Sequence, residues 1–290
     1  MFNPFIVLDV LLIFFILYLI VRPIPLKYLL ISCTNLPKSE PKIDEAVGKI
    51  EHFYVDKFKA TLYSNASGKN NKLLVFVQGG AFLTCDIETT YALMNEFAER
   101  LSEFDVVTFD YGVRFSYTIQ NMVQHVYKII QKCREFRNYT ILHGIGMSAG
   151  SLIIGAMQTC EYKNLNDLMR LKDPSDKNNY KFETFTSLCG LLNTTFRNSY
   201  LDFLFRNYLL RKTPASVYYT CYDLPELKKF IISSQSEYLK HQSIEFVAKE
   251  KCQYEIYSAD FNLTHTFPLF TNINKTQECI ENVVKFIRSV

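Results

Sequence analysis

The sequence lacks several features that would assign a protein quickly to a class. Basic and acidic side chains nearly balance, 32 against 29, so no dense basic stripe predicts a nucleic-acid partner. Low-complexity and collagen-like stretches are missing, with only 10 glycines and 9 prolines in 290 residues. Hydrophobic residues make up 48% of the chain, enough to bury a large core. This composition is typical of a globular protein with one main domain.

The cysteines contain no C-x-x-C pair, which disfavours a structural zinc site and thioredoxin-like chemistry. Their even number permits disulfides in an oxidising compartment, and buried free thiols explain the same pattern in a domain with its own core. Cysteine usage therefore leaves the compartment open. The eight cysteines are Cys33, Cys85, Cys133, Cys160, Cys189, Cys221, Cys252 and Cys279.

Near the N-terminus, residues 5–21 are almost wholly apolar, with Asp9 as the one charged residue. A helix of that length is just able to cross a hydrocarbon layer of about 30 Å with some local thinning. No small-x-small cleavage site follows it, so we expect an uncleaved signal-anchor rather than a signal peptide. The expected organisation is a single-pass membrane anchor at 1–22, a tether at 23–42 and one globular domain at 43–290.

The side of the membrane on which this domain lies is open to two arguments. Arg22 and Lys27 follow the apolar segment, and the positive-inside rule then favours a cytoplasmic domain. Five Asn-x-Ser/Thr sequons favour instead a glycoprotein whose domain lies in the endoplasmic reticulum lumen or outside the cell, and we expect this second arrangement. The sequons begin at Asn65, Asn138, Asn193, Asn262 and Asn274.

Beyond the tether, short apolar runs alternate with stretches of helical period. Strand followed by helix, repeated, predicts an α/β fold with a mostly parallel sheet and helices on both faces. The expected strands are residues 49–64, 73–77, 106–109, 140–143, 185–192, 230–233 and 252–257. The expected helices are residues 89–103, 119–136, 149–157, 239–251 and 276–287.

Two segments do not follow this alternation. Residues 161–181 are rich in Asn, Asp and Lys, as in a solvated excursion. Residues 194–219 contain LDFLFRNYLL, whose apolar residues recur at helical spacing. That segment is either a small cap over a site or an ordinary core helix.

A G-x-S-x-G motif at residues 146–150 follows one expected strand and precedes an expected helix. In that context the central Ser148 is expected on a tight strand-to-helix turn, where the glycines remove side chains that would clash. A chance Gly/Ser turn is the alternative. We expect Ser148 to be a nucleophile.

A serine hydroxyl needs a base to take its proton, and in this strand order the histidine follows an acid that follows the serine. Only His241 and His265 come after Ser148. His265 lies between the last expected strand and the C-terminal helix, where a loop reaches the carboxyl edge of the sheet. For the orienting acid we favour Glu237, which ends a strand of its own, over Asp260.

Residues 78–82, QGGAF, come directly after the expected strand 73–77. Small residues there would let backbone N–H groups approach a tetrahedral oxyanion, where one good donor contributes roughly 3–4 kcal/mol. A plain glycine turn explains the segment equally well on its own. Together with the ordered serine, acid and histidine it is the expected oxyanion loop.

At these residues the chain resembles the α/β-hydrolase fold, and within it the hormone-sensitive-lipase and arylacetamide-deacetylase-like carboxylesterases. Those enzymes carry H-G-G-G, G-D-S-A-G, a D-x-L acid loop and H-x-F. This sequence has QGGA at 78–81, GMSAG at 146–150, EYL at 237–239 and HTF at 265–267. The resemblance covers roughly residues 73–270 in element order.

The resemblance implies a membrane-anchored serine carboxylic-ester hydrolase that needs no cofactor or metal and acts on a small-molecule or lipid ester. The sequence departs from the family pattern at three positions. Gln78 stands where the family has histidine, Met147 where it has aspartate, and Glu237 where it usually has aspartate. The rival expectation is an inactive hydrolase-fold protein that binds a partner or a lipid. The implied site residues are Ser148, His265 and Glu237 as the triad, and Gly80, Ala81 and Ala149 as donors of the oxyanion hole.

Overall fold

The computed structural model of the chain describes residues 36–45, 48–66, 70–113, 116–165, 180–193, 221–237, 239–258 and 263–290. The chain divides into two compact units, Met1–Leu36 and Pro37–Val290. The expected anchor at 1–22 and the cap candidate at 194–219 lie outside the described residues, as does most of the excursion at 161–181. Across the described ranges, no helix has the length and apolar character needed to cross a bilayer.

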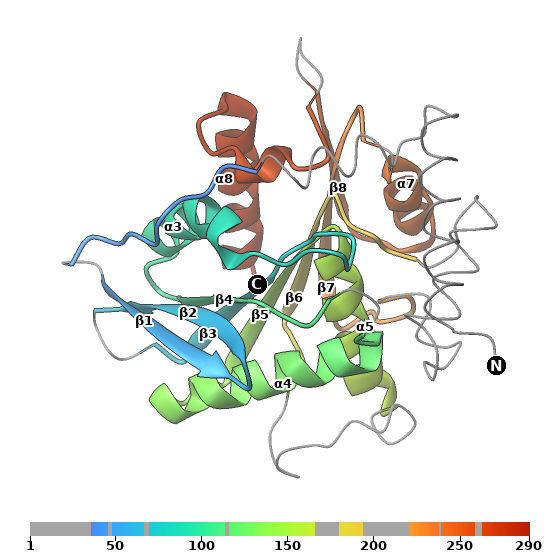
Figure 1. Cartoon of the computed structure of the whole chain (residues 1–290). Helices are drawn as coiled ribbons and strands as arrows, with labels where there is room; N and C mark the ends of the chain where they lie inside the picture. Colours follow the sequence, from blue (N-terminus) through green and yellow to red (C-terminus); the bar gives the residue numbers. More distant parts are fainter. Residues whose placement is uncertain are drawn as a thin grey trace, which may run out of the picture. The chain divides into compact units, whose positions relative to one another are not determined.

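An eight-stranded sheet forms the centre of the unit Pro37–Val290 (Figure 1). Its strand order is β1-β2-β4-β3-β5-β6-β7-β8. The β1–β2 and β2–β4 pairs are antiparallel, and every later pair is parallel, so the expected mostly parallel sheet is confirmed. The strands are β1 Gly48–Val55, β2 Phe58–Asn65, β3 Lys72–Val77, β4 Asp105–Phe109, β5 Ile141–Met147, β6 Thr184–Leu188, β7 Lys228–Ser234 and β8 Gln253–Tyr257.

Residues 49–64, expected as one strand, form a hairpin of two antiparallel strands instead, so that prediction was wrong. β1 and β2 pair along their full length, with Val55 opposite Phe58. Asp56 and Lys57 make the turn, and Asp56 has a φ of 54°. Because aspartate tolerates the left-handed region, this turn needs neither glycine nor proline, and the alternation runs through it unbroken.

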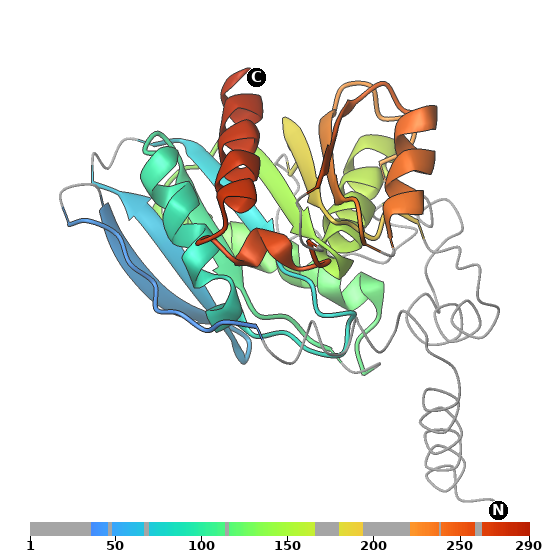
Figure 2. The same cartoon turned by 90° about the horizontal axis from the view of Figure 1, so that it is seen from above.

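Helices cover both faces of the sheet, as the alternation predicts (Figures 1 and 2). α3 packs against α8 on one face, and α4 packs against α5 on the other. α4 begins with a capping box, in which Thr118 Oγ1 accepts from the backbone N of Asn121 and Asn121 Oδ1 accepts from the backbone N of Thr118. The helices are α3 Tyr91–Arg100, α4 Ile119–Phe136, α5 Ala149–Lys163, α7 Lys240–Lys249 and α8 Asn274–Arg288, with 3-10 turns η1 Ile87–Thr89 and η4 Phe267–Leu269.

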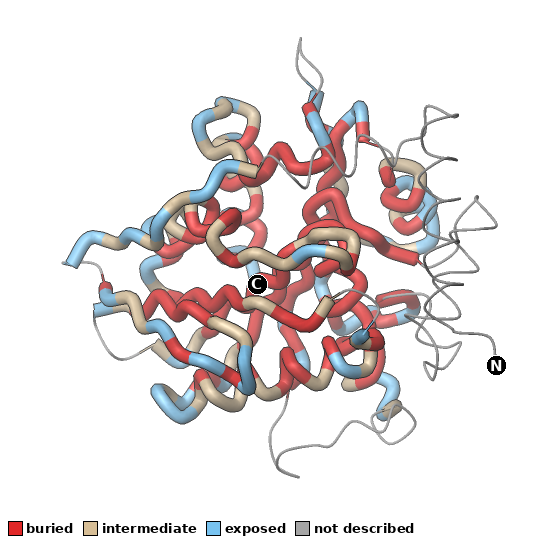
Figure 3. Tube along the Cα trace, in the orientation of Figure 1, coloured by how far each residue is buried: buried red, intermediate tan, exposed pale blue. Residues whose placement is uncertain are grey.

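The central strands are buried on both faces, which is why they read as unbroken apolar runs (Figure 3). The chain runs from β3 to β4 on one side of β3 and then crosses to β5 on the other side. In open α/β sheets, ligands bind at such a reversal, outside the carboxyl ends of the strands. The fold therefore points to the carboxyl ends of β3 and β5 as the place for a site.

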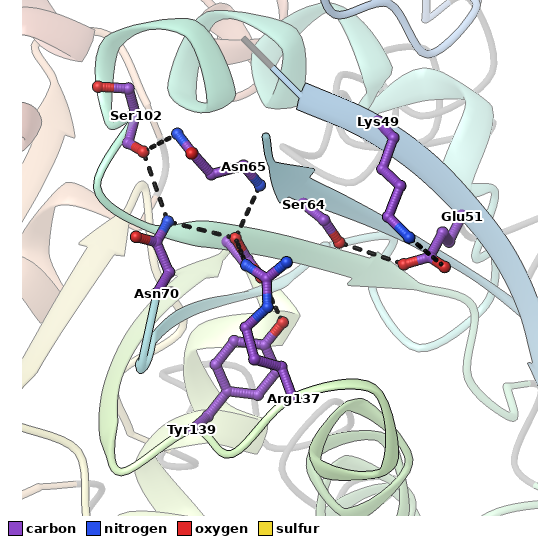
Figure 4. Close-up of polar contacts among 9 residues, drawn as sticks. Lys49, Glu51, Ser64, Asn65, Asn70, Ser102, Arg137 and Tyr139 are labelled. Carbon is purple, nitrogen blue, oxygen red and sulfur yellow. Dashed lines mark hydrogen bonds and ion pairs between the residues drawn. The ribbon is translucent and has the colours of Figure 1, made fainter. Parts of the chain in front are cut away.

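A buried carboxylate lies at the amino end of β4, on the side of the sheet away from the carboxyl ends of the parallel strands. Asp105, the first residue of β4, has no exposed surface and accepts from Arg137 Nη1 at 2.7 and 3.0 Å. Tyr139 Oη and the backbone N of Asn65 also donate to it, so these residues converge from three segments (Figure 4). A buried charge with this many donors is compensated, and it fixes the amino end of β4.

Candidate active site

Ser148 lies on a strained turn between β5 and α5. Its φ of 50° and ψ of −120° are unusual for a residue with a Cβ and cost about 1–3 kcal/mol. Its backbone carbonyl accepts from the N–H groups of Ser151 at 3.1 Å and Leu191 at 2.9 Å. These two bonds hold the turn, so the side chain is presented at the carboxyl end of the sheet.

Both glycines of the G-x-S-x-G motif are required by close packing. A Cβ on Gly146 would lie 2.4 Å from the Cα of Ser151. A Cβ on Gly150 would lie 2.0 Å from the carbonyl oxygen of Val77 at the end of β3. Neither position has room for a side chain unless backbone moves, so the sequence motif follows from how tightly α5 begins against β3 and β5.

The structure brings Ser148, His265 and Glu237 within hydrogen-bond distance. His265 Nε2 lies 2.7 Å from Ser148 Oγ, and His265 Nδ1 lies 2.8 Å from Glu237 Oε2. All three residues are buried, with 5 to 6% of their surface exposed. They come from three places far apart in the sequence: the turn after β5, the segment after β7 and the turn before η4.

Two further side chains surround the acid, and sequence reasoning did not identify them. Ser233, in β7, donates from Oγ to Glu237 Oε1 at 2.6 Å. Cys189, directly after β6, offers a Sγ within 4.8 Å of the ligand atoms of Glu237 and His265. Burial, and then the charge of Glu237, raise the pKa of the Cys189 thiol well above its usual value. Glu237 is therefore flanked by a hydroxyl donor and by a neutral thiol.

The loop after β3 runs beside the serine. A Cβ on Gly79 would lie 2.7 Å from Ser148 Cβ and 3.4 Å from Ser148 Oγ. Gly80 has a φ of 128° and Ala81 a φ of 54°. Within the described ranges, the backbone N–H groups of Gly80, Ala81 and Ala149 have no hydrogen-bond partner. Gly79 therefore packs against the nucleophile, and the two residues that follow it, like Ala149 after Ser148, have backbone donors that these contacts leave unused.

Gln78 ties this loop to the end of β4. Its Nε2 lies 3.2 Å from Asp110 Oδ1 and 2.9 Å from Cys85 Sγ. Its carbonyl accepts from Tyr111 Oη at 2.9 Å, and Asp110 Oδ1 also accepts from the backbone N of Ile87 at 2.8 Å. Burial raises the pKa of Asp110. Asp110 and Tyr111 follow β4 directly, and that strand-end position is the signal that could have identified them.

Of the two alternatives weighed for the site, the structure describes His241 alone. His241 lies on α7, whereas His265 contacts the serine. Asp260 lies outside the described residues, and Glu237 is the carboxylate beside His265. Seven of the eight cysteines fall in the described ranges and all seven are free thiols.

Sequence comparison finds no match for this chain, neither to a protein-family model nor to a curated protein. Solved structures do match. Esterase B from Lactobacillus rhamnosis is 16% identical with a TM-score of 0.67, over 86% of this chain and 88% of that chain. The structure of the same esterase with a C4-C4 tributyrin phosphonate is also 16% identical, with a TM-score of 0.69, and it covers the same 86% of this chain and 88% of that chain. EstE5 soaked with p-nitrophenyl butyrate is 16% identical with a TM-score of 0.66, over 90% of each chain.

At such identities the likeness is one of fold. The first of these matches covers 86% of this chain, whose centre is the mostly parallel eight-stranded sheet. The neighbours are esterases and lipases, and their architecture is the one that the motifs predict. The chain therefore has the α/β-hydrolase fold.

Proposed function

We propose that this chain is a serine carboxylic-ester hydrolase with Ser148 as nucleophile, His265 as general base and acid, and Glu237 as its orienting partner. The observation that carries the proposal is the unbroken pair of hydrogen bonds from Ser148 Oγ through the His265 ring to Glu237. A buried serine on a strained turn, beside an imidazole and a carboxylate, is the arrangement that activates a hydroxyl.

The direction of proton transfer follows from the partners of the imidazole. An ionised carboxylate only accepts hydrogen bonds, so Nδ1 of His265 carries the proton and donates it to Glu237. Nε2 is then the free acceptor and takes the proton of Ser148 as Oγ attacks the ester carbonyl. The imidazolium passes that proton to the leaving alcohol, and a water molecule later releases the acid from the acyl-enzyme by the same steps.

The negative charge of the tetrahedral intermediate needs donors already in place. We assign this role to the backbone N–H groups of Gly80, Ala81 and Ala149, which have no partner among the described residues. Gly79, which precedes two of these amides, packs against Ser148, and this contact supports amides that are in place before the reaction begins.

For the substrate we propose a small-molecule or lipid ester with a short acyl group. Support comes from the neighbours, whose ligands are a tributyrin phosphonate and p-nitrophenyl butyrate. We also propose that the chain is related to the hormone-sensitive-lipase and arylacetamide-deacetylase-like carboxylesterases, on the motifs around residues 78, 148, 237 and 265.

A fluorophosphonate probe and p-nitrophenyl butyrate test this proposal. We expect wild type to be labelled and to hydrolyse the ester, and Ser148→Ala to lose labelling and to lower kcat by about 10⁴-fold or more. Ser289→Ala is the control, since Ser289 is an exposed serine after α8. Folded wild type that is neither labelled nor active would favour the rival, a hydrolase-fold protein that binds a partner or lipid.

We propose further that residues 1–22 anchor the protein in the membrane, with the folded domain in the endoplasmic reticulum lumen or outside the cell. The sequons differ in how far the folded domain exposes them. Asn138 and Asn274 are exposed to solvent, whereas Asn193 is buried, with 5% of its surface exposed. A glycan needs solvent, so we expect glycans at Asn138 and Asn274 and none at Asn193.

The measurement is the mass shift of the protein from a eukaryotic host on treatment with peptide N-glycosidase. Asn138→Gln and Asn274→Gln should each remove one glycan, and Asn193→Gln should remove none. Membrane pellets washed with alkaline carbonate should retain the full chain and release a chain that lacks residues 1–22. A full-length protein whose mass does not change would place the domain on the cytoplasmic side.

A further inference from the structure

Cys189, Glu237 and His265 have side chains that can bind a metal ion, and they lie close together. The proposed ester hydrolysis uses no metal at this place. We propose that these three residues bind a zinc-like divalent cation and that the bound cation switches the hydrolase off. The proposal rests on the proposed function, because Glu237 and His265 belong to the triad. Cys189 is the addition that turns a catalytic dyad into a metal site.

The geometry is close to what zinc requires. The three ligand atoms lie within 4.8 Å of one another, and His265 Nδ1 is 2.8 Å from Glu237 Oε2. Zinc bonds of about 2.0–2.3 Å in a tetrahedron hold ligand atoms roughly 3.3–3.8 Å apart. Side-chain movements of about 1 Å or less would bring the three atoms to that spacing. A water molecule would complete the tetrahedron, as in zinc sites with three protein ligands.

The ligand types select the metal. One thiolate, one imidazole nitrogen and one carboxylate oxygen form a mixed soft and borderline set that suits Zn²⁺ and Co²⁺, whereas Mg²⁺ and Ca²⁺ prefer six or more oxygens. All three residues are buried. The two charges of the cation are matched by those of the Cys189 thiolate and the Glu237 carboxylate, so the occupied site carries no net charge in a place where an unpaired charge is costly.

Occupation would reverse the hydrogen bond that activates the serine. Glu237 faces Nδ1 of His265, so a cation between the carboxylate and the thiol binds at Nδ1. The Cys189 S–H bond breaks and its proton leaves to solvent, while the Nδ1 proton of His265 is transferred to Nε2. Nε2–H then donates toward Ser148 Oγ and no longer accepts its proton, and the hydroxyl loses its base.

Cobalt absorption tests the site without relying on activity. Purified full-length protein, incubated to equilibrium with Co²⁺, should develop a thiolate-to-cobalt charge-transfer band and tetrahedral d–d bands. Cys189→Ser should lose the charge-transfer band and weaken binding by more than the roughly 10–100-fold that loss of an outer-shell partner costs. Cys252→Ser, a half-buried cysteine elsewhere, is the matched control and should keep both. A band retained in Cys189→Ser, or lost in Cys252→Ser instead, would overturn the proposal.

Inhibition of the hydrolase by Zn²⁺ is the second test of the metal site. Zn²⁺ should lower ester hydrolysis and fluorophosphonate labelling of wild type, a chelator should restore both, and Mg²⁺ should have no effect. Each variant is compared with its own metal-free rate, and Cys189→Ser should show no zinc inhibition. If wild type lacks hydrolase activity but shows the Cys189-dependent cobalt spectrum, only the proposed function fails. If activity is present and no such spectrum forms, only the metal site fails.

Discussion

Gln78 lies directly after β3, where the proposed oxyanion loop begins. Its Nε2 contacts Asp110 and Cys85, and the residue is 4% exposed. We expect Gln78→Ala to lower kcat by about 10-fold to 100-fold with little change in KM, less than the roughly 10²–10³ lost with an oxyanion donor itself. Steady-state kinetics on p-nitrophenyl butyrate measure both constants.

The matched variant is Gln78→His, which replaces the amide N–H that donates to Asp110 with a ring N–H. It should recover most of the lost kcat if the side chain acts by positioning the loop. If Gln78→Ala left kcat unchanged, the loop would be held by its backbone contact with Tyr111 alone.

At this scale the sequence predicted which residues lie together better than it predicted what supports them. The order of serine, acid and histidine placed Ser148, Glu237 and His265 together, and the structure brings them within 2.8 Å. Cys189 lies directly after β6 and Ser233 lies in β7, and nothing local in the sequence says that these two strands are adjacent. Contacts of that kind need the strand order, which a single sequence does not supply.

The start of α5 against β3 is the element contact on which the site geometry depends. A Cβ on Gly150 would lie 2.0 Å from the Val77 carbonyl oxygen and 2.6 Å from that of Gln78. We expect Gly150→Ala to destabilise the fold by about 1–3 kcal/mol and to lower kcat beyond any loss of folded protein, because Gln78 is the first residue of the proposed oxyanion loop. Urea unfolding and kcat at a temperature where the variant stays folded measure the two effects.

A Gly150→Ala protein with wild-type unfolding free energy and kcat would mean that α5 yields without moving the loop. Gly79→Ala gives a comparison from the loop side, since its added Cβ would meet Ser148 Cβ at 2.7 Å. That variant should lower kcat while leaving the junction between α5 and β3 intact.

Element boundaries were predicted less well than element types, for physical reasons. β5 was expected to end at residue 143, because Gly144 and Gly146 resemble strand breakers. In the structure the strand continues to Met147. Gly144 is instead the space into which Phe182 packs, since a Cβ there would lie 2.3 Å from the Phe182 ring. The glycines signal close approach of other segments rather than the end of the strand.

On the scale of the whole molecule, two buried histidines outside the site make stability depend on pH. Burial lowers the pKa of His143 and of His125, each to about 4. Both side chains sit against aromatic rings, Phe104 for His143 and Phe58 for His125. Each is therefore neutral in the folded protein at pH values where it is already protonated in the unfolded chain.

The sign follows from proton counting. Between the unfolded pKa of 6.5 and the folded value near 4, the unfolded state binds more protons, so the free energy of unfolding falls as the pH is lowered. We expect each histidine to contribute roughly 1–2 kcal/mol of that loss between pH 7 and pH 5. Urea unfolding at both pH values measures it. His143→Gln can keep the hydrogen bond to Thr184 Oγ1, and it should lose less unfolding free energy between pH 7 and pH 5 than wild type. The control is His241→Gln, at a partly exposed position on α7, and it should lose as much as wild type. Equal losses in wild type and His143→Gln would mean that His143 is protonated without unfolding.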